Sequence, residues 1–264
     1  MDILEQSKTL YRSPDSGLTD RFKLAVDEIN DGSDVLEIGV GWGELAGHLA
    51  SHKKVNLYAV DAGESALEKI KSFVKDSQLA DISREKIKFK DNQFDIVVCL
   101  EVFEHLQNPY HALSEIQRVL KPGGKLLLSV PNDLGGHIVI YPGLVRPEFF
   151  RLFLRQNFFR VIKEHYWGPV WNKDNVGELL KSKIGDNGMA GFLLKLVQAG
   201  IKFLQFTARL LGVRAASLYW CYFFVCENKK DQADKPFWLR QLEQTSELGA
   251  RHPGWYHSYF HRKA

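Results

Sequence analysis

The chain has 264 residues, 45% of them hydrophobic, which is enough for one large domain with a buried core and excludes a chain that is disordered throughout. Its 35 basic and 32 acidic residues give a formal charge of +3, a balance that does not indicate a nucleic-acid-binding surface. The polar N-terminal segment lacks the apolar core of a signal peptide, so we expect a cytoplasmic protein whose three cysteines are reduced.

Strands and helices alternate in the first half of the chain. Strands are predicted from short apolar runs at residues 34–40, 55–60, 78–82, 94–100 and 125–130. Helices are predicted from amphipathic spacing at residues 18–30, 44–51, 64–73 and 109–120. This alternation predicts an α/β fold in which a parallel sheet carries helices on both faces.

The second half of the chain is less regular. Prolines and glycines interrupt it after Pro131, which indicates a loop-rich region that faces the substrate. Helices are predicted at residues 148–156 and 191–213, and strands at residues 158–164 and 218–226. The remaining residues form a polar, aromatic tail.

A glycine-rich loop joins the first strand to the next helix, and it reads EIGVGWG from Glu37 to Gly43. Glycines at this place let the backbone turn tightly and approach a ligand at the helix N-terminus. The spacing is GxGxG, whereas nicotinamide dinucleotide enzymes normally have GxGxxG. The loop therefore argues against a nicotinamide cofactor, which nevertheless stays an alternative.

Asp61 stands at the end of the second predicted strand, about 20 residues after the glycine loop. A carboxylate at this position can accept two hydrogen bonds from ribose hydroxyls. The alternative is that Asp61 only caps the helix that follows. The combination with the glycine loop favours the ribose role.

Three further segments carry a family resemblance. They read QLADISREKIKFKDNQFD from Gln78, IVVCLEVFEHLQNP from Ile96 and LKPGGKLLLSVPN from Leu120. Together with the glycine loop they resemble class I S-adenosylmethionine (SAM) dependent methyltransferases, especially those of the ubiquinone pathway and of other small molecules. The resemblance covers residues 34–132 and says little about the substrate.

The resemblance implies a Rossmann-like, doubly wound sheet of seven strands whose last strand is antiparallel, with a helical insertion near the C-terminus. The expected parts are an N-terminal helical cap at 1–30, a SAM-binding core at 31–134, a substrate-side region at 135–228 that completes the sheet and holds the insertion at 189–213, and the tail at 229–264.

The implied cofactor site comprises Glu37, Gly39, Gly41, Gly43, Asp61, Ala62, Asp81, Ile82 and Leu100. Within it, Asp61 holds the ribose hydroxyls, Asp81 lies beside the adenine, and Ala62 and Ile82 flank the adenine ring. Trp42 departs from the family pattern, which has a smaller residue there. We expect it to fill a gap under the N-terminal helix rather than to stack near the substrate.

Glu101, Glu104 and His105 are the candidate catalytic residues. In some relatives a matching ExxEH motif holds a divalent cation, which here would be Mg²⁺ and would polarise an accepting hydroxyl. In others no metal is known to be needed, and His105 would then act as a general base or orient a loop. Both roles stay open.

The expected function is therefore SAM-dependent methylation, with a hydroxyl oxygen of a small or lipid-linked molecule as the leading acceptor. The alternatives are an RNA methyltransferase, a nicotinamide-dependent oxidoreductase and a non-catalytic protein of the same fold. Only the basic, aromatic residues 251–263 favour RNA, so nucleic acid is not the expected partner.

Residues 192–211 form an apolar segment with one narrow polar stripe, which comprises Lys195, Gln198, Lys202, Gln205 and Arg209. The three basic groups argue against a membrane-spanning helix but suit a helix that lies at a membrane surface. The alternative is a lid or core helix over the substrate cleft. Peripheral membrane contact through this segment is the expectation.

Overall fold

The computed structural model describes residues 20–131, 140–141, 144–169, 192–193, 195–197, 199–200, 203, 207 and 219–230. Its strands are β1 (Asp34–Ile38), β2 (Asn56–Asp61), β3 (Asp76–Leu79), β4 (Phe94–Leu100), β5 (Leu120–Pro131), β6 (Phe159–Pro169) and β7 (Tyr219–Asn228). Its helices are α2 (Asp20–Glu28), α3 (Glu44–His52), α4 (Glu64–Ile70), α5 (Pro109–Val119) and α6 (Pro147–Gln156), with a 3-10 turn η1 (Phe103–His105).

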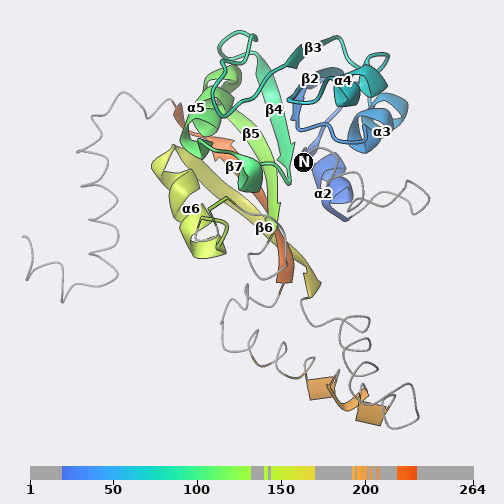
Figure 1. The fold of residues 1–264 in the computed structure, drawn as a ribbon, viewed down its shortest axis with the longest axis vertical. Coiled ribbons are helices and arrows are strands. Elements are labelled where there is room, and N and C mark those ends of the chain that lie inside the picture. The colour runs from blue at the N-terminus through green and yellow to red at the C-terminus, as the bar shows by residue number, and fades with distance from the viewer. Residues whose placement is uncertain are drawn as a thin grey trace, which may run out of the picture. The chain divides into compact units, whose positions relative to one another are not determined.

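The strands form one seven-stranded sheet in the order β3-β2-β1-β4-β5-β7-β6 (Figure 1). Strands β1 to β5 pair in parallel, and β7 pairs antiparallel with both β5 and β6. The predicted fold class, including the antiparallel last strand, is confirmed. Of the predicted helix at 191–213, the structure describes only part, and those residues are helical.

The third strand lies slightly before its predicted position at residues 78–82. Its ladder with β2 ends at the pair Asp61 and Leu79, after which the Ala80 N–H donates to the Asp61 carbonyl at 2.9 Å. Ile82 is buried in the turn that follows rather than in the sheet. Its apolar side chain therefore gave the appearance of a longer strand.

Apolar side chains cover both faces of the sheet. One buried cluster joins Val97 and Cys99 of β4 to Phe150 and Phe153 of α6, and the other joins Ile96 and Val98 to residues of α2, α3 and α4. This alternation along β4 is the mark of a strand that is buried on both sides. Within the described residues, no helix is both long enough and apolar enough to cross a bilayer.

The direction of the strands places several loops at one edge of the sheet. The C-terminal ends of β1, β2, β4 and β5 share this edge because these strands are parallel. α5 starts shortly after β4 ends, so its N-terminus lies there as well. β6 runs in the same direction as β5, since both are antiparallel to β7, and α6 therefore also begins at this edge. In such folds ligands bind at the C-terminal edge.

Candidate functional site

The glycine loop after β1 has a backbone that only glycine adopts easily. Gly39, Gly41 and Gly43 have φ angles of 76°, 56° and 81°. A Cβ on Gly39 would lie 2.3 Å from Val102 Cγ2, and one on Gly43 would lie 2.6 Å from Ile70 Cγ2, so these two glycines allow close packing. A Cβ on Gly41 would meet nothing within 4 Å, and this position therefore presents open backbone.

Asp61, the last residue of β2, ties the glycine loop to the neighbouring strand. Its Oδ2 accepts a hydrogen bond from the Val40 N–H at 2.6 Å, and its Oδ1 accepts one from the Gly63 N–H at 2.7 Å. A carboxylate has about four acceptor positions, so both oxygens keep capacity for ligand hydroxyls. The structure therefore brings together the first two sequence motifs.

Glu37 lies beneath this loop with its side chain buried. Burial, together with the nearby charge of Asp61, raises the pKa of Glu37 to about 8. Its Oε2 has no hydrogen-bond partner among the described residues. A buried polar atom without a partner is costly, and such atoms are often explained by a function or a missing ligand.

The pKa of Glu37 predicts a pH dependence of stability. Between pH 4.5, the ordinary pKa, and about 8, the folded chain keeps a proton that the unfolded chain releases, so the free energy of unfolding falls as the pH rises. Glu37→Gln removes this ionisation. We expect the melting temperature of the variant, relative to the wild type, to increase from pH 4.5 to pH 8.

Thermal melts across this pH range, without added ligand, provide the measurement. The exposed Glu148 on α6 offers a control, because Glu148→Gln should leave the difference from the wild type constant. If the Glu37→Gln difference is also constant with pH, Glu37 does not keep its proton in the folded chain.

The predicted adenine side of the site follows β2 and β3. Ile82 is buried and Ala62 is exposed. Asp81 binds the Ser83 N–H at 2.9 Å and pairs with Arg84 Nε at 2.9 Å. Partial burial would raise the pKa of Asp81, but these hydrogen bonds and the Arg84 charge outweigh it and hold the pKa below its ordinary value.

His111 lies on this side of the site although it was not among the predicted site residues, and Trp42 in the glycine loop differs from its expected role. His111 Nδ1 lies 3.0 Å from the Ile82 carbonyl oxygen and so ties α5 to the turn that carries Ile82. Trp42 is 47% exposed, and Lys69 Nζ lies 3.8 Å from the centre of its ring. The interpretation of Trp42 as a buried gap filler is therefore wrong, because the indole lies at the surface under a cation.

Glu101 follows β4 in a left-handed conformation, with a φ of 56° that is uncommon for residues other than glycine. Its Oε1 accepts a hydrogen bond from Ser129 Oγ at 2.8 Å, and the Cys221 thiol lies 3.9 Å from its Oε2. Strands β5 and β7 thus fix the carboxylate. Leu100, just before it, is buried. Strained residues of this kind are frequent at functional sites.

Glu104 and His105 lie on η1, directly beyond Glu101. The Glu104 side chain is fully buried, and neither carboxylate oxygen has a hydrogen-bond partner among the described residues. Burial raises the pKa of Glu104 well above its ordinary value, and the neighbouring Glu101 adds to this effect. His105 is exposed, with Nε2 at 3.8 Å from Glu104 Oε1. The structure therefore pairs a buried carboxyl group with an accessible imidazole.

In the described part of the chain, no three His, Cys, Asp or Glu side chains are arranged so that they could hold a metal ion. The features at the strand edge do fit a bound SAM. Gly41 offers open backbone, Glu37 has an unpartnered oxygen, and Asp61 has spare acceptor capacity. An electrophile held there would be next to the loop that carries His105.

Comparison with known proteins finds a methyltransferase domain in the part of the chain that carries this candidate site. A family model described as "Methyltransferase domain" matches residues 36–128. The ubiquinone biosynthesis O-methyltransferase of Coxiella burnetii (strain Dugway 5J108-111) is 36% identical over 106 residues, which are 38% of this chain and 44% of that protein. The glycine/sarcosine/dimethylglycine N-methyltransferase of Actinopolyspora halophila is 26% identical over 220 residues, which are 73% of this chain and 38% of that protein.

The fold has a solved counterpart as well. The crystal structure of a SAM dependent methyltransferase from Archaeoglobus fulgidus superposes with a TM-score of 0.60 and 18% identity, and the match covers 86% of this chain and 100% of that one. The chain spans less than half the length of the two curated relatives that it matches. The comparisons therefore show a methyltransferase domain at residues 36–128, but not the acceptor.

Proposed function

Because residues 36–128 form a class I SAM-dependent methyltransferase domain, we propose that the protein transfers the methyl group of SAM to a hydroxyl oxygen of a small or lipid-linked molecule. One observation carries this proposal. The Val40–Asp61 hydrogen bond joins the glycine loop to the carboxylate after β2, at the same sheet edge as Glu101, Glu104 and His105.

Different residues of this chain would bind the cofactor and remove the acceptor's proton. The glycine loop, Glu37 and Asp61 would hold the cofactor, with Asp81 and Ile82 at its adenine end. When bound, SAM supplies a methyl group on a sulfonium, which needs mainly an aligned nucleophile and the exclusion of water. His105 would take the acceptor's hydroxyl proton at its imidazole, and Glu104 would orient that ring.

We propose a hydroxyl oxygen rather than a nitrogen as the methyl acceptor because His105 can act as a base. The names of the two relatives describe an O-methyltransferase and an N-methyltransferase, so family membership leaves the choice open. A hydroxyl of high pKa needs a base, and His105 beside a buried carboxyl group offers one. The Mg²⁺ ion that the ExxEH motif left open for Glu101, Glu104 and His105 is not part of the proposal, because these side chains are not arranged to hold a metal ion.

The test is methyl transfer from labelled SAM to a whole-cell extract that is then separated into lipid, saccharide, RNA and protein fractions. Label in the lipid or small-molecule fractions supports the proposal. Label in RNA would make the protein an RNA methyltransferase. A protein that binds NAD but not S-adenosylhomocysteine would instead be an oxidoreductase, and one that binds neither would be non-catalytic.

We also propose that residues 192–211 touch a membrane surface. Phe192, Leu196 and Phe203 are exposed, and helical spacing places them on one side of a helix. Lys195 is exposed as well, which suits anionic headgroups. We expect the protein to float with anionic liposomes and Lys195→Glu to weaken this. A protein that stays at the bottom of the gradient would support a lid over the cleft instead.

A further inference from the structure

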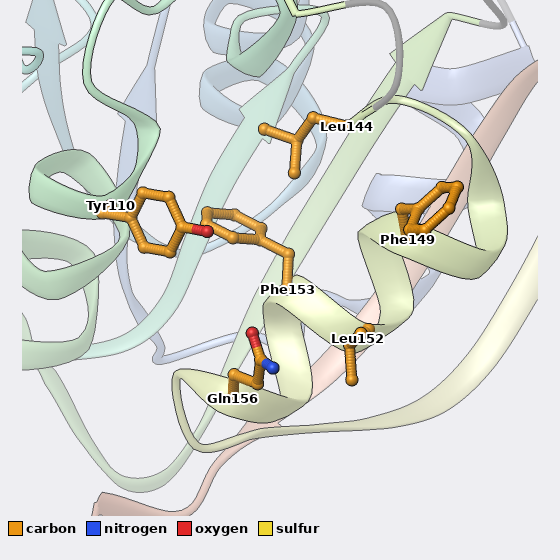
Figure 2. A pocket seen from close by; sticks show the side chains of 6 residues that line it. All are labelled: Tyr110, Leu144, Phe149, Leu152, Phe153 and Gln156. Carbon is orange, nitrogen blue, oxygen red and sulfur yellow. The ribbon is translucent and has the colours of Figure 1, made fainter.

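An apolar groove of about 300 Å³ lies on the surface between α5 and α6 (Figure 2). Its lining residues are Tyr110, Leu144, Phe149, Leu152, Phe153 and Gln156. Phe153 is buried at its floor, whereas Phe149 and Leu152 are 55% and 47% exposed. α6 therefore carries large apolar side chains on its outer face, in addition to those it packs against the sheet.

The groove begins at the edge of the sheet that carries the candidate site. Tyr110 is the second residue of α5, which follows η1 in the chain, and Phe149 is in the first turn of α6. The ring of Phe153 contacts both Tyr110 and Phe103 of η1, with ring centres 4.9 and 6.2 Å apart, respectively. Phe103 is itself buried and does not line the groove, but it packs against Phe153 and immediately precedes Glu104 and the candidate base His105.

The segment before α6 completes this connection. The Ile140 N–H donates to the Glu104 carbonyl oxygen at 2.9 Å, and the Tyr141 hydroxyl donates to the Gln107 carbonyl oxygen at 2.8 Å. Both residues have exposed side chains. They extend the apolar surface from the groove towards the loop after β4.

The uncharged side chains that line the groove favour an apolar ligand. None of the six lining side chains is charged, and the polar groups among them are the Tyr110 hydroxyl and the Gln156 amide. The volume is at the lower end of the range for small-molecule sites. From Phe149 to Gln156 the groove follows α6 for roughly 10 Å. An open, uncharged and mostly apolar groove of this length fits a hydrocarbon chain.

We propose that the groove between α5 and α6 holds the hydrocarbon chain of the methyl acceptor while its hydroxyl group lies at His105. This inference rests on the proposed function, because it takes methyl transfer next to η1 as given. Its basis is the contact of Phe153 with η1, together with the exposed side chains of Ile140 and Tyr141, whose backbone bonds link η1 to the lining residue Leu144. A membrane surface and a second copy of the chain are the competing occupants.

Calorimetry with para-ethylphenol, para-butylphenol and para-hexylphenol, without SAM, tests the proposal. We expect the affinity to rise about fourfold for each added methylene, which corresponds to ~0.8 kcal/mol per buried CH₂. Leu152→Glu should abolish this gain, and its exposed position should leave the fold intact. Leu79→Glu, at an equally exposed apolar residue of β3, should keep the gain.

A para-alkylphenol with a photoreactive group at the end of its chain adds a positional readout, and we expect labelling within residues 147–156. A chain-length gain that persists in Leu152→Glu, or labelling elsewhere, would overturn the proposal. So would a Leu152→Glu variant that loses only liposome binding or self-association. The binding measurement needs no turnover, so methylation of para-ethylphenol without a chain-length gain would refute the groove and leave the proposed function standing.

Discussion

Asp61→Ala is expected to weaken the binding of S-adenosylhomocysteine by roughly two orders of magnitude, which corresponds to about 3 kcal/mol of charge-assisted hydrogen bonds. The structure gives two reasons for so large an effect. The variant loses the carboxylate that we propose as the acceptor for the ribose hydroxyls, and it also releases the Val40 N–H that Asp61 binds in the glycine loop. Isothermal titration calorimetry measures the loss directly.

Asp76→Ala is the matched control. Asp76 is also a hydrogen-bonded carboxylate, at the start of β3, where it accepts from Lys88 Nζ at 2.7 Å and from the Ser77 N–H at 2.8 Å. It lies away from the ligand edge of the sheet, because it pairs with Tyr58 in the middle of β2, three residues before Asp61. Its removal should leave the affinity unchanged. A folded Asp61→Ala variant that binds with wild-type affinity would show that the cofactor site is misassigned.

His105→Ala is expected to lower kcat by about 10²- to 10⁴-fold, the range for loss of a general base, while the affinity for S-adenosylhomocysteine changes little. The imidazole is exposed and η1 keeps its buried Phe103 and Glu104, so the fold should survive. His52→Ala, at another exposed histidine, on α3, should retain full activity.

EDTA tests whether the cluster of Glu101, Glu104 and His105 uses a metal ion, the alternative that the sequence left open. If His105 acts as a base, the wild type should keep its activity in EDTA. If the cluster holds Mg²⁺, EDTA should abolish activity and added Mg²⁺ should restore it. Activity that survives both EDTA and His105→Ala would reduce the cluster to a structural loop.

Much of the fold could be predicted because its information is local. Strands buried on both faces appear as short apolar runs, and their alternation with amphipathic helices implies a parallel sheet. The antiparallel β7 came from the family resemblance. Periodicity could not find the end of β3, because Ile82 is as apolar as a strand residue although it is buried in a turn.

The cofactor side of the site was visible for a related reason. A glycine loop and a strand-end carboxylate are needed at fixed places along a strand–loop–helix unit, so spacing points to the loop and to Asp61. The roles of Glu37, Gly39 and Gly41 towards SAM come from the family resemblance. What spacing could not show is that Asp61 already binds the Val40 N–H. It also could not show that Trp42 is at the surface beneath Lys69.

The sequence by itself indicated a methyltransferase domain, its cofactor and the edge of the sheet that carries the candidate site, because each motif lies within a few consecutive residues. Only the tertiary structure decided how the acceptor side is built. Cys221 approaches Glu101 across 120 positions of sequence, and the groove forms where α5 meets α6. Such contacts depend on which distant elements become neighbours, and side-chain packing between them leaves no periodic signal in the chain.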